Sequence, residues 1–373
     1  MNRNDGRRHV IVGAMVAHLD GQFPPEWAEP WDRIGLIAGD PSRDLSGVLV
    51  TLDPTLEAIG RAADLGCEML VTHHPVLTEM PATLTPGTGP SGALFIALSR
   101  GVALYAAHTN ADRHPDGSDV LPLAAGLEPG EPLEEDMQSM SLVTTFCPEA
   151  SADSVAAAMA GAGAGRLGRY HGCSFAVAGE GRYTPGPGTR SSSGMTGEQT
   201  RAPEQRIEAV CPAHAVAAVV AAARASHPYE EPLIAVADAA VARGVARMGR
   251  LCAAPAGTTL ASFARGAGKR LGVTPRVWGD PRRPVRKVAT ANGSGRGLVR
   301  AALAAGADTM LTGELRYHDA LSALESGLAV VEAGHDATEW PIVDVLAKAV
   351  RSCPDGAGIT VHVDEPAVRW WTP

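Results

Sequence analysis

The stretch Glu68-Met-Leu-Val-Thr-His-His-Pro75 decides the fold class of this chain, because a short apolar run leads directly into two adjacent histidines. Such a run is typical of a strand that is buried on both faces of a parallel sheet. Two further apolar runs end in the same way: Val102–Ala107 before His108 and Asp112, and Leu328–Ala333 before His335 and Glu339. Ligands of open α/β sheets bind beyond the carboxyl ends of the strands. We therefore expect these three strand ends to meet in one site.

Strand-like and helical patterns alternate in the first and last thirds of the chain, which predicts parallel sheets with helices on their faces. The strands expected there are residues 47–53, 68–72, 102–107, 284–291, 309–312 and 328–333. Because ligand candidates lie on both sides of a middle segment of different character, we expect a discontinuous α/β core domain of residues 1–130 and 246–373. Residues 131–245 would form a second, inserted domain.

The middle segment reads as strand, helix, strand and helix. The elements expected there are Gln138–Phe146, Ala152–Ala162, Gln205–Val210 and His214–Ala225. Residues 181–205 contain Pro, Gly, Ser and Thr with almost no large apolar side chain, and this composition predicts a long loop.

Composition excludes several classes of protein. The 373 residues carry a formal net charge of −9 and contain five Phe and five Tyr, which argues against a nucleic-acid-binding surface. No segment offers the ~20 uninterrupted apolar residues of a membrane span, and the apolar stretch 10–16 is too short for a cleavable signal. The six cysteines are scattered without a C-x-x-C pair, so we expect a reduced, cytoplasmic protein.

The ligand types at the three strand ends favour a metal centre. His335 and Glu339 have i, i+4 spacing, which places both on one face of a helix's first turn. The rings of His73 and His74 can diverge toward two ions where the strand ends, and Asp112 would supply a bridging carboxylate. Three imidazoles and two carboxylates suit a pair of borderline divalent metals, namely Zn, Fe, Mn or Ni, and not Ca or Mg.

Three further side chains are candidates for supporting roles. We expect His108 to lie behind the metal ligands and to orient Asp112 or a ligand histidine; the alternative is an ordinary strand-end hydrogen bond. Glu314 and His318 also follow a strand with i, i+4 spacing, and they are candidate general acid/base groups. The alternative for this pair is a glutamate at a helix N-terminus with a packing histidine.

Two glycine-rich stretches resemble nucleotide-binding loops. Gly163–Gly168 matches G-x-G-x-x-G literally but follows a helical pattern, whereas the dinucleotide fingerprint requires a preceding strand, so no bound cofactor of that kind is predicted. Asn292–Gly297 lies between a strand and a helix. Its amides could hold a phosphate or carboxylate, or the segment could be a tight turn with no ligand.

The motifs resemble those of the GTP cyclohydrolase 1 type 2 homologs, also called the Ngg-interacting-factor-three-like proteins. The resemblance covers nearly the whole chain. The stretches that carry it are Trp31–Leu36, Thr72–Pro75, His108–Asp112, Gly165–Phe175, His227–Pro232 and Gly334–Glu339.

This resemblance implies a two-metal centre bound by His73, His74, Asp112, His335 and Glu339. It also implies an inserted domain similar to the PII/CutA ferredoxin-like fold and a ring-shaped homohexamer. The activity that we expect is metal-dependent hydrolysis of a nucleotide or a related small molecule. The alternative is a non-enzymatic metal-binding regulator or scaffold whose inserted domain senses a ligand.

Overall fold

The computed structural model describes residues 10–366 apart from positions 78, 80, 136, 169, 243 and 357. The chain forms two compact units, one of residues up to Glu135 together with those from Val245 onward, and one of the residues between them. The expected domain boundaries near residues 130 and 245 stay a prediction, and the ends of the expected core, 1–9 and 367–373, lie outside the described residues.

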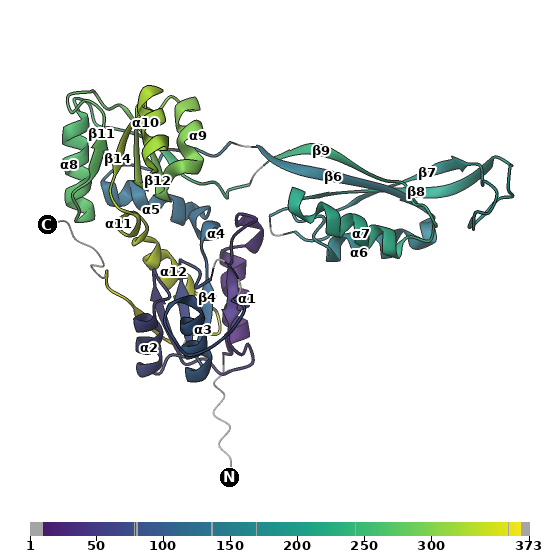
Figure 1. Ribbon diagram of the computed structural model, residues 1–373, viewed down its shortest axis with the longest axis horizontal. Helices are drawn as coiled ribbons and strands as arrows, with labels where there is room; N and C mark the ends of the chain where they lie inside the picture. The colour runs from purple at the N-terminus through teal and green to yellow at the C-terminus, as the bar shows by residue number, and fades with distance from the viewer. Residues whose placement is uncertain are drawn as a thin grey trace, which may run out of the picture. The chain divides into compact units, whose positions relative to one another are not determined.

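The first unit contains two sheets, shown in Figure 1. The first sheet has the strand order β1-β4-β3-β2-β15, and every neighbouring pair is parallel except β1 with β4. Its strands are β1 (Gly35–Ala38), β2 (Gly47–Thr51), β3 (Met69–Thr72), β4 (Ala103–Ala106) and β15 (Thr360–Val363).

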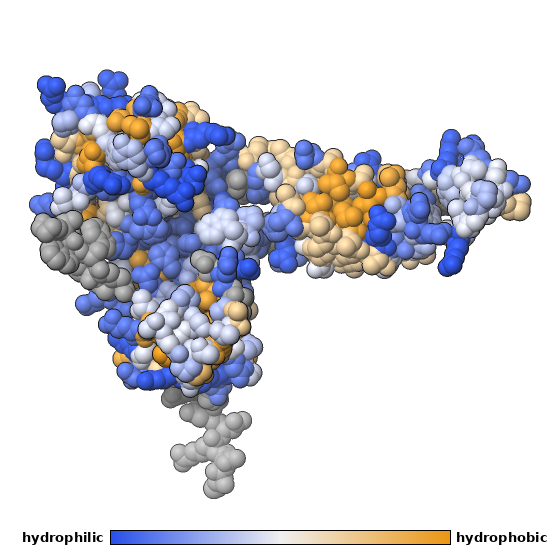
Figure 2. All heavy atoms as spheres, in the orientation of Figure 1, coloured by the Kyte–Doolittle hydropathy of each residue, from blue (hydrophilic) through white to orange (hydrophobic). Residues whose placement is uncertain are grey.

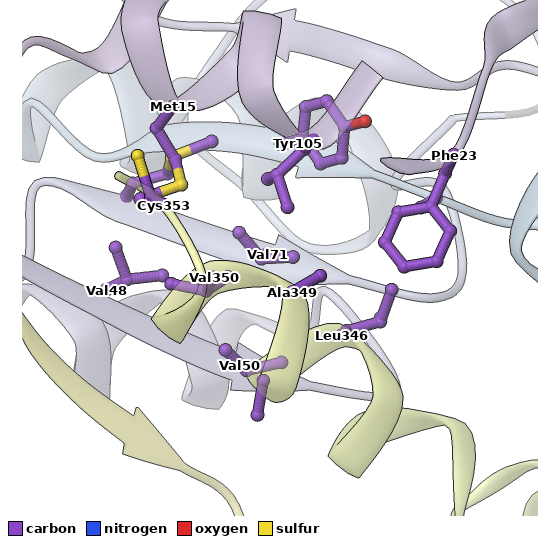
Figure 3. Packing of buried hydrophobic residues seen from close by; sticks show 14 of the residues in the cluster. Met15, Phe23, Val48, Val50, Val71, Tyr105, Leu346, Ala349, Val350 and Cys353 are labelled. Atoms are coloured by element: carbon purple, nitrogen blue, oxygen red, sulfur yellow. The ribbon is translucent and has the colours of Figure 1, made fainter. Parts of the chain in front are cut away.

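Helices cover both faces of this sheet. They are α1 (Val12–Gln22), α2 (Leu56–Asp64), α3 (Gly89–Arg100) and α12 (Ile342–Arg351). Since neighbouring side chains on a strand point to opposite faces, Val48 and Val50 pack with α1 and α12, whereas Leu49 packs with α2 and α3. Figure 3 shows Met15, Leu346 and Val350 against the strand valines on the first of these faces. Both faces are buried, which explains the continuous apolar runs in the sequence.

The second sheet has the order β11-β14-β13-β12-β10-β5 and is mixed, with β14, β13 and β12 parallel to one another. Its strands are β5 (Glu131–Pro132), β10 (Arg250–Ala253), β11 (Arg276–Trp278), β12 (Lys287–Ser294), β13 (Thr309–Glu314) and β14 (Ala329–Glu332). Helices α5 (Pro115–Ala125) and α8 (Leu260–Leu271) pack on one face. On the other face lie α9 (Val299–Ala304) and α10 (Tyr317–Glu325).

Four short helices complete the first unit. They are η1 (Pro25–Trp27), α4 (Thr109–Asp112), η3 (Gly295–Leu298) and α11 (His335–Glu339). Helices α4 and α11 directly follow the carboxyl ends of β4 and β14, so each begins beside the expected site. On the face shown in Figure 2, hydrophilic residues gather between the two sheets of this unit.

The inserted unit is a four-stranded antiparallel sheet of order β7-β8-β6-β9. Its elements are β6 (Met137–Cys147), α6 (Glu149–Gly161), β7 (Phe175–Tyr183), β8 (Thr200–Cys211), η2 (Ala213–Ala215), α7 (Val216–Ser226) and β9 (Ile234–Ala242). This βαββαβ connection is the ferredoxin-like arrangement. It confirms the expected fold class, an α/β core with an α+β ferredoxin-like insertion.

The long loop expected over residues 181–205 is wrong at both ends. Strand β7 continues to Tyr183 and β8 begins at Thr200, so the irregular segment spans only 184–199. The side chains of β7, an edge strand, are almost all exposed. Its stability comes from backbone hydrogen bonds to β8, and such a strand lacks the apolar pattern that sequence reasoning uses.

None of the described helices is long and apolar enough to cross a membrane.

Candidate metal centre

The ring of His73 is completely buried just beyond the end of β3. Its Nδ1 lies 2.9 Å from the carbonyl oxygen of Ala107, to which it donates, so Nε2 is the nitrogen left to face the site. This Nε2 has no hydrogen-bond partner among the described residues. It lies 3.8 Å from Asp112 Oδ2 and 3.9 Å from Glu339 Oε1. A buried polar atom without a partner costs free energy, and a cation with bonds of ~2 Å to nitrogen and oxygen fits between these three atoms.

His74 and His335 share the other oxygen of the same carboxylate. His74 Nε2 lies 2.8 Å and His335 Nε2 3.0 Å from Glu339 Oε2, and the two ring centroids are 5.4 Å apart. Each ring is anchored at its other nitrogen, His74 by Asp53 at 2.8 Å and His335 by Glu314 at 3.2 Å. Orientation of this kind is what metal-binding imidazoles require.

The pKa values of these groups follow from their contacts. Burial by itself lowers the pKa of His74, but hydrogen bonds to Asp53 and Glu339 raise it to about 10. The hydrogen bond to Glu339 outweighs burial at His335 and raises its pKa to about 9. Burial raises the pKa of Glu339, but the surrounding imidazoles hold it well below its usual range. The site therefore carries a buried carboxylate whose charge needs cationic partners, which protons or a metal can supply.

Two glycines leave room for these ligands. Gly293 lies at φ +51°, and a Cβ there would fall 1.9 Å from Glu339 Oε1 and 2.9 Å from His335 Nε2. A Cβ on Gly313 would lie 2.5 Å from the carbonyl oxygen of Gly293 and 2.8 Å from the Cα of His335. Side chains at these positions would occupy the space that α11 and its carboxylate fill.

Asp112 ends α4 and faces His73. Its Oδ1 accepts a hydrogen bond of 3.1 Å from Asn292 Nδ2, and the same amide donates to the carbonyl oxygen of Gly117. The sequence assigned the bridging position to Asp112. Which carboxylate would bridge two ions stays a prediction: Glu339 contacts His73, His74 and His335, whereas Asp112 approaches the first of these.

The role expected for His108, to orient Asp112 or a ligand histidine, stays a prediction. Its Nδ1 lies 2.9 Å from Asp32 Oδ1. Asp32 is fully buried and also accepts hydrogen bonds from the backbone N and the hydroxyl of Thr109. Burial by itself raises the pKa of Asp32, but the hydrogen bonds from His108 and Thr109 lower it to about 2.

The structure separates the two candidate acid/base residues. Glu314 reaches His335 from the end of β13, whereas His318 is exposed on α10 with its ring against that of Tyr317. Among the described residues, the clusters with metal-ligand spacing contain neither side chain. The expected turn at 292–297 is partly strand, since β12 continues to Ser294. The side chain of Asn292 donates a hydrogen bond to Asp112.

Sequence reasoning missed three supporting residues: Asp53, Asp32 and Asn292. Asp53 follows β2 as His74 follows β3, so the rule that ligands lie at strand ends could have found it. Asp32 lies within a stretch that carries the family resemblance, but no local pattern reveals its long-range contact with His108.

Three groups of side chains in the described part of the chain could hold a metal ion. They are His73, Asp112 and Glu339; His74, His335 and Glu339; and His73, His74 and His108. In each group one ligand atom per residue lies within 4.8 Å of the others. The mixture of imidazole nitrogen and carboxylate oxygen fits a borderline divalent cation, and the unpaired Nε2 of His73 gives that cation a reason to bind.

Fold and site together define a class: an α/β protein with a ferredoxin-like insertion and a candidate metal site at the carboxyl ends of its strands. The sequence profile of the family described as Duf34/NIF3 (NGG1p interacting factor 3) matches residues 10–366. The chain belongs to this family.

Relatives match along nearly the whole chain. Proteins named "GTP cyclohydrolase 1 type 2 homolog" from Mycobacterium leprae and Mycobacterium tuberculosis are each 35% identical, covering 94% and 95% of this chain and 92% and 94% of their own. The Bacillus subtilis protein of the same name is 32% identical over 95% of this chain and 96% of its own.

Solved structures show the same fold. A Bacillus cereus protein related to NIF3 is 29% identical, covers 98% of both chains and has a TM-score of 0.64. A Staphylococcus aureus protein that is 23% identical, covering 97% of this chain and 98% of its own, has a TM-score of 0.66.

Proposed function

We propose that this protein is a metal-dependent hydrolase of a nucleotide or a related small molecule, with two divalent cations bound by His73, His74, Asp112, His335 and Glu339. One observation carries the proposal: the buried Glu339 presents Oε1 to His73 and Oε2 to His74 and His335. A carboxylate approached on both oxygens by separate imidazoles is arranged to bridge two ions.

The ligands divide naturally between two positions. His73, Asp112 and Glu339 would hold one cation, and His74, His335 and Glu339 the other. These nitrogen and oxygen donors suit Zn, Fe, Mn or Ni. When bound, such ions lower the pKa of a coordinated water to ~7 and polarise a substrate oxygen.

The protein's own groups keep the ligands in place. The Ala107 carbonyl and Asp53 fix the rings of His73 and His74, and Asn292 holds Asp112. Glu314 holds His335, which makes ring orientation its first role. Proton transfer by Glu314 or His318 stays a prediction.

The relatives' printed name directs the choice of substrate to GTP. Two hydrolyses are compatible with the ligand set: opening of the guanine imidazole ring and cleavage of a phosphoester. The homohexamer and the cytoplasmic location stay predictions. Sedimentation of the purified chain tests the first of them.

The test is hydrolysis by purified protein loaded in turn with Zn, Fe, Mn and Ni. GTP and a panel of other nucleotides are assayed by chromatography for ring-opened and dephosphorylated products. We expect turnover that His74→Ala abolishes and that His214→Ala, at an exposed position of the inserted unit, leaves unchanged. No turnover above the His74→Ala level with any metal or nucleotide would refute the hydrolase.

One observation favours the alternative, a regulator whose inserted domain senses a ligand. The inserted unit contains a hollow of about 850 Å³ lined by strand β7, the segment after it, and side chains that include Phe146, Glu204 and Tyr229. The rings of Tyr183 and Tyr229 are 6.2 Å apart there, and Tyr229 donates to Glu204. In this alternative, metal removal lowers the melting temperature, while the metal-loaded protein hydrolyses no nucleotide. Calorimetry with and without a chelator, run beside the nucleotide assay, distinguishes the two.

A further inference from the structure

The three expected ligand histidines share one feature, a hydrogen-bond acceptor on the nitrogen that faces away from the site. The acceptors are a carbonyl oxygen for His73, Asp53 for His74 and Glu314 for His335. Each acceptor holds one ring nitrogen and leaves the other nitrogen facing the cluster, where it can bind a metal once it is deprotonated.

A fourth imidazole, that of His108, has the same arrangement. Its Nδ1 is held by the buried carboxylate of Asp32, which Thr109 in turn fixes through its backbone N and its hydroxyl. With Nδ1 held by Asp32, Nε2 is the nitrogen of His108 that is left to bind a metal. This carboxylate has a fully buried side chain and four hydrogen bonds, the fourth from the backbone N of Arg33, so it orients the ring at least as firmly as Glu314 orients His335.

The ring of His108 lies against the ligand rings themselves. Its centroid is 5.1 Å from that of His73 and 5.6 Å from that of His74, compared with 5.4 Å between His74 and His335. One nitrogen of each of His73, His74 and His108 lies within 4.8 Å of the others. Two nitrogens bound to one ion lie at most about 4.2 Å apart, so a small rotation of the rings suffices.

The chain's second half supplies an independent argument. His108 and Asp112 follow β4 with i, i+4 spacing, as His335 and Glu339 follow β14. The two strands occupy the same place in their sheets, each between an antiparallel edge strand and a parallel neighbour. His335 reaches the cluster from this position, and His108 starts from its counterpart.

We propose that His108 is a metal ligand, held in its binding orientation by Asp32, so that four imidazoles and two carboxylates surround the cations. This inference rests on the metal centre proposed above and extends it by one residue. The chemical class of its partner is the same borderline divalent cation.

The test counts imidazoles around zinc in the full-length protein. Metal-free protein is loaded with Zn²⁺ and examined by X-ray absorption at the zinc edge, where imidazole rings give a distinct outer-shell signal, and zinc affinity is measured against a chromophoric chelator. We expect His108→Gln to lose outer-shell imidazole signal and to bind zinc about 10–100-fold more weakly. His214→Gln, the same change at an exposed position of the inserted unit, should match the wild type in both measurements.

Asp32→Asn tests the orienting part of the proposal. An amide can donate to Nδ1 and so favours the tautomer with its proton on Nε2, which cannot bind metal. We expect the same loss of imidazole signal while His108 is still present. If this variant fails to fold, because Thr109 also depends on Asp32, the His108→Gln spectrum decides.

The possible failures are distinguishable. A wild-type protein that binds no zinc would overturn the metal centre and this inference with it. If the wild type binds zinc and His108→Gln keeps the same imidazole signal, only the ligand role of His108 is overturned. This holds even if His108→Gln binds zinc more weakly, since a purely structural role could lower the affinity.

Discussion

The two halves of the first unit are built on the same plan but contribute differently to the site. In each half a helix, α1 or α8, precedes an edge strand, β1 or β11. Three further strands follow in the chain and are joined to one another through helices. The resulting strand orders are β1-β4-β3-β2 and β11-β14-β13-β12. Both halves pair the edge strand antiparallel and the other three parallel. Equivalent strand ends can therefore be compared directly.

The clearest difference lies beyond the third strand of each plan. Thr72 pairs with Ala106 and Thr312 pairs with Glu332, so His73 and His74 correspond to Gly313 and Glu314. His74 approaches the shared carboxylate directly, whereas Glu314 acts on it through His335. At this position the first half supplies two imidazoles, and the second half supplies a glycine and a carboxylate that holds His335.

The reason for the glycine is steric. Helix α11 begins at His335 and lies against Gly313, whose missing Cβ would meet the Cα of His335 at 2.8 Å. The equivalent position in the first half carries the side chain of His73. The repeated plan thus brings the strand ends of both halves together. Close packing of α11 excludes a side chain at Gly313, the position equivalent to His73.

The largest effect is expected at the carboxylate that both positions share. Glu339→Gln removes the charge that three imidazoles surround, and we expect bound zinc to fall to background in elemental analysis while the circular dichroism spectrum is retained. The matched control is Glu57→Gln, at an exposed position of α2. Full zinc content in Glu339→Gln would mean that the two halves bind metal without a shared ligand.

The steric account of the glycine predicts the next effect. A methyl group at Gly313 meets backbone atoms that cannot move independently, so we expect Gly313→Ala to lower the free energy of unfolding by about 3 kcal/mol, the upper end for overpacking. Gly60→Ala, in α2 where a Cβ would meet nothing within 4 Å, should instead stabilise by about 0.5–1 kcal/mol. Urea unfolding measures both. Equal effects would refute the steric explanation.

The loss of zinc affinity on replacing a supporting carboxylate, Asp53 or Glu314, should be larger where the side chain is less exposed. The side chain of Asp53 is 27% exposed and that of Glu314 61%, and hydrogen bonds in more buried surroundings are stronger. We expect Asp53→Asn to weaken zinc binding by about 10–100-fold and Glu314→Gln to weaken it less, both measured by chelator competition. The reverse order would indicate that the second half contributes more to orientation than its burial suggests.

A pH-dependent difference is expected from Glu332, whose counterpart in the first half is Ala106. Burial raises the pKa of Glu332, but hydrogen bonds from Arg276, Leu315 and Trp278 lower it overall. A carboxyl with a depressed pKa stabilises the fold above its ordinary pKa of 4.5, and this contribution is lost as the pH falls below that value.

Glu332→Gln should therefore destabilise at pH 7 by about 1.5 kcal/mol, and the difference from the wild type should shrink at pH 4 and below. Urea unfolding at several pH values measures it. A difference that does not change with pH would show that Glu332 acts through packing and not through its charge.

Traces of the repeated plan are present in the sequence but are short. Gly39-Asp40-Pro41 and Gly279-Asp280-Pro281 both follow an edge strand with glycine at positive φ. Asp40 and Asp280 each accept a hydrogen bond of 2.9 Å from the backbone two residues on. Glu68 and Asp308 each accept backbone hydrogen bonds from the start of the preceding strand. These residues stabilise turns and the first residues of strands. The two halves share too few of them to be aligned from the sequence without the strand order.

Edge strands account for most of what could not be predicted of the fold. The buried strands β2, β3, β4, β13 and β14 were predicted because both their faces are apolar. Strand β7 is exposed on both faces, and β11 has three residues. Backbone pairing with a neighbour holds such strands, and pairing leaves no signature in side-chain hydropathy.

The sequence by itself determined which residues can bind a cation: histidines and acids placed directly after buried strands, where a parallel sheet leaves its ligands exposed. Only the tertiary structure decided how they divide the work. It brought Glu339 against His73 and His74, and it placed Asp32, Asp53 and Asn292 against His108, His74 and Asp112. These contacts depend on distances between side chains as far apart in the sequence as His74 and Glu339, which are separated by 265 residues. Such distances are set by the packing of two sheets and not by any local pattern.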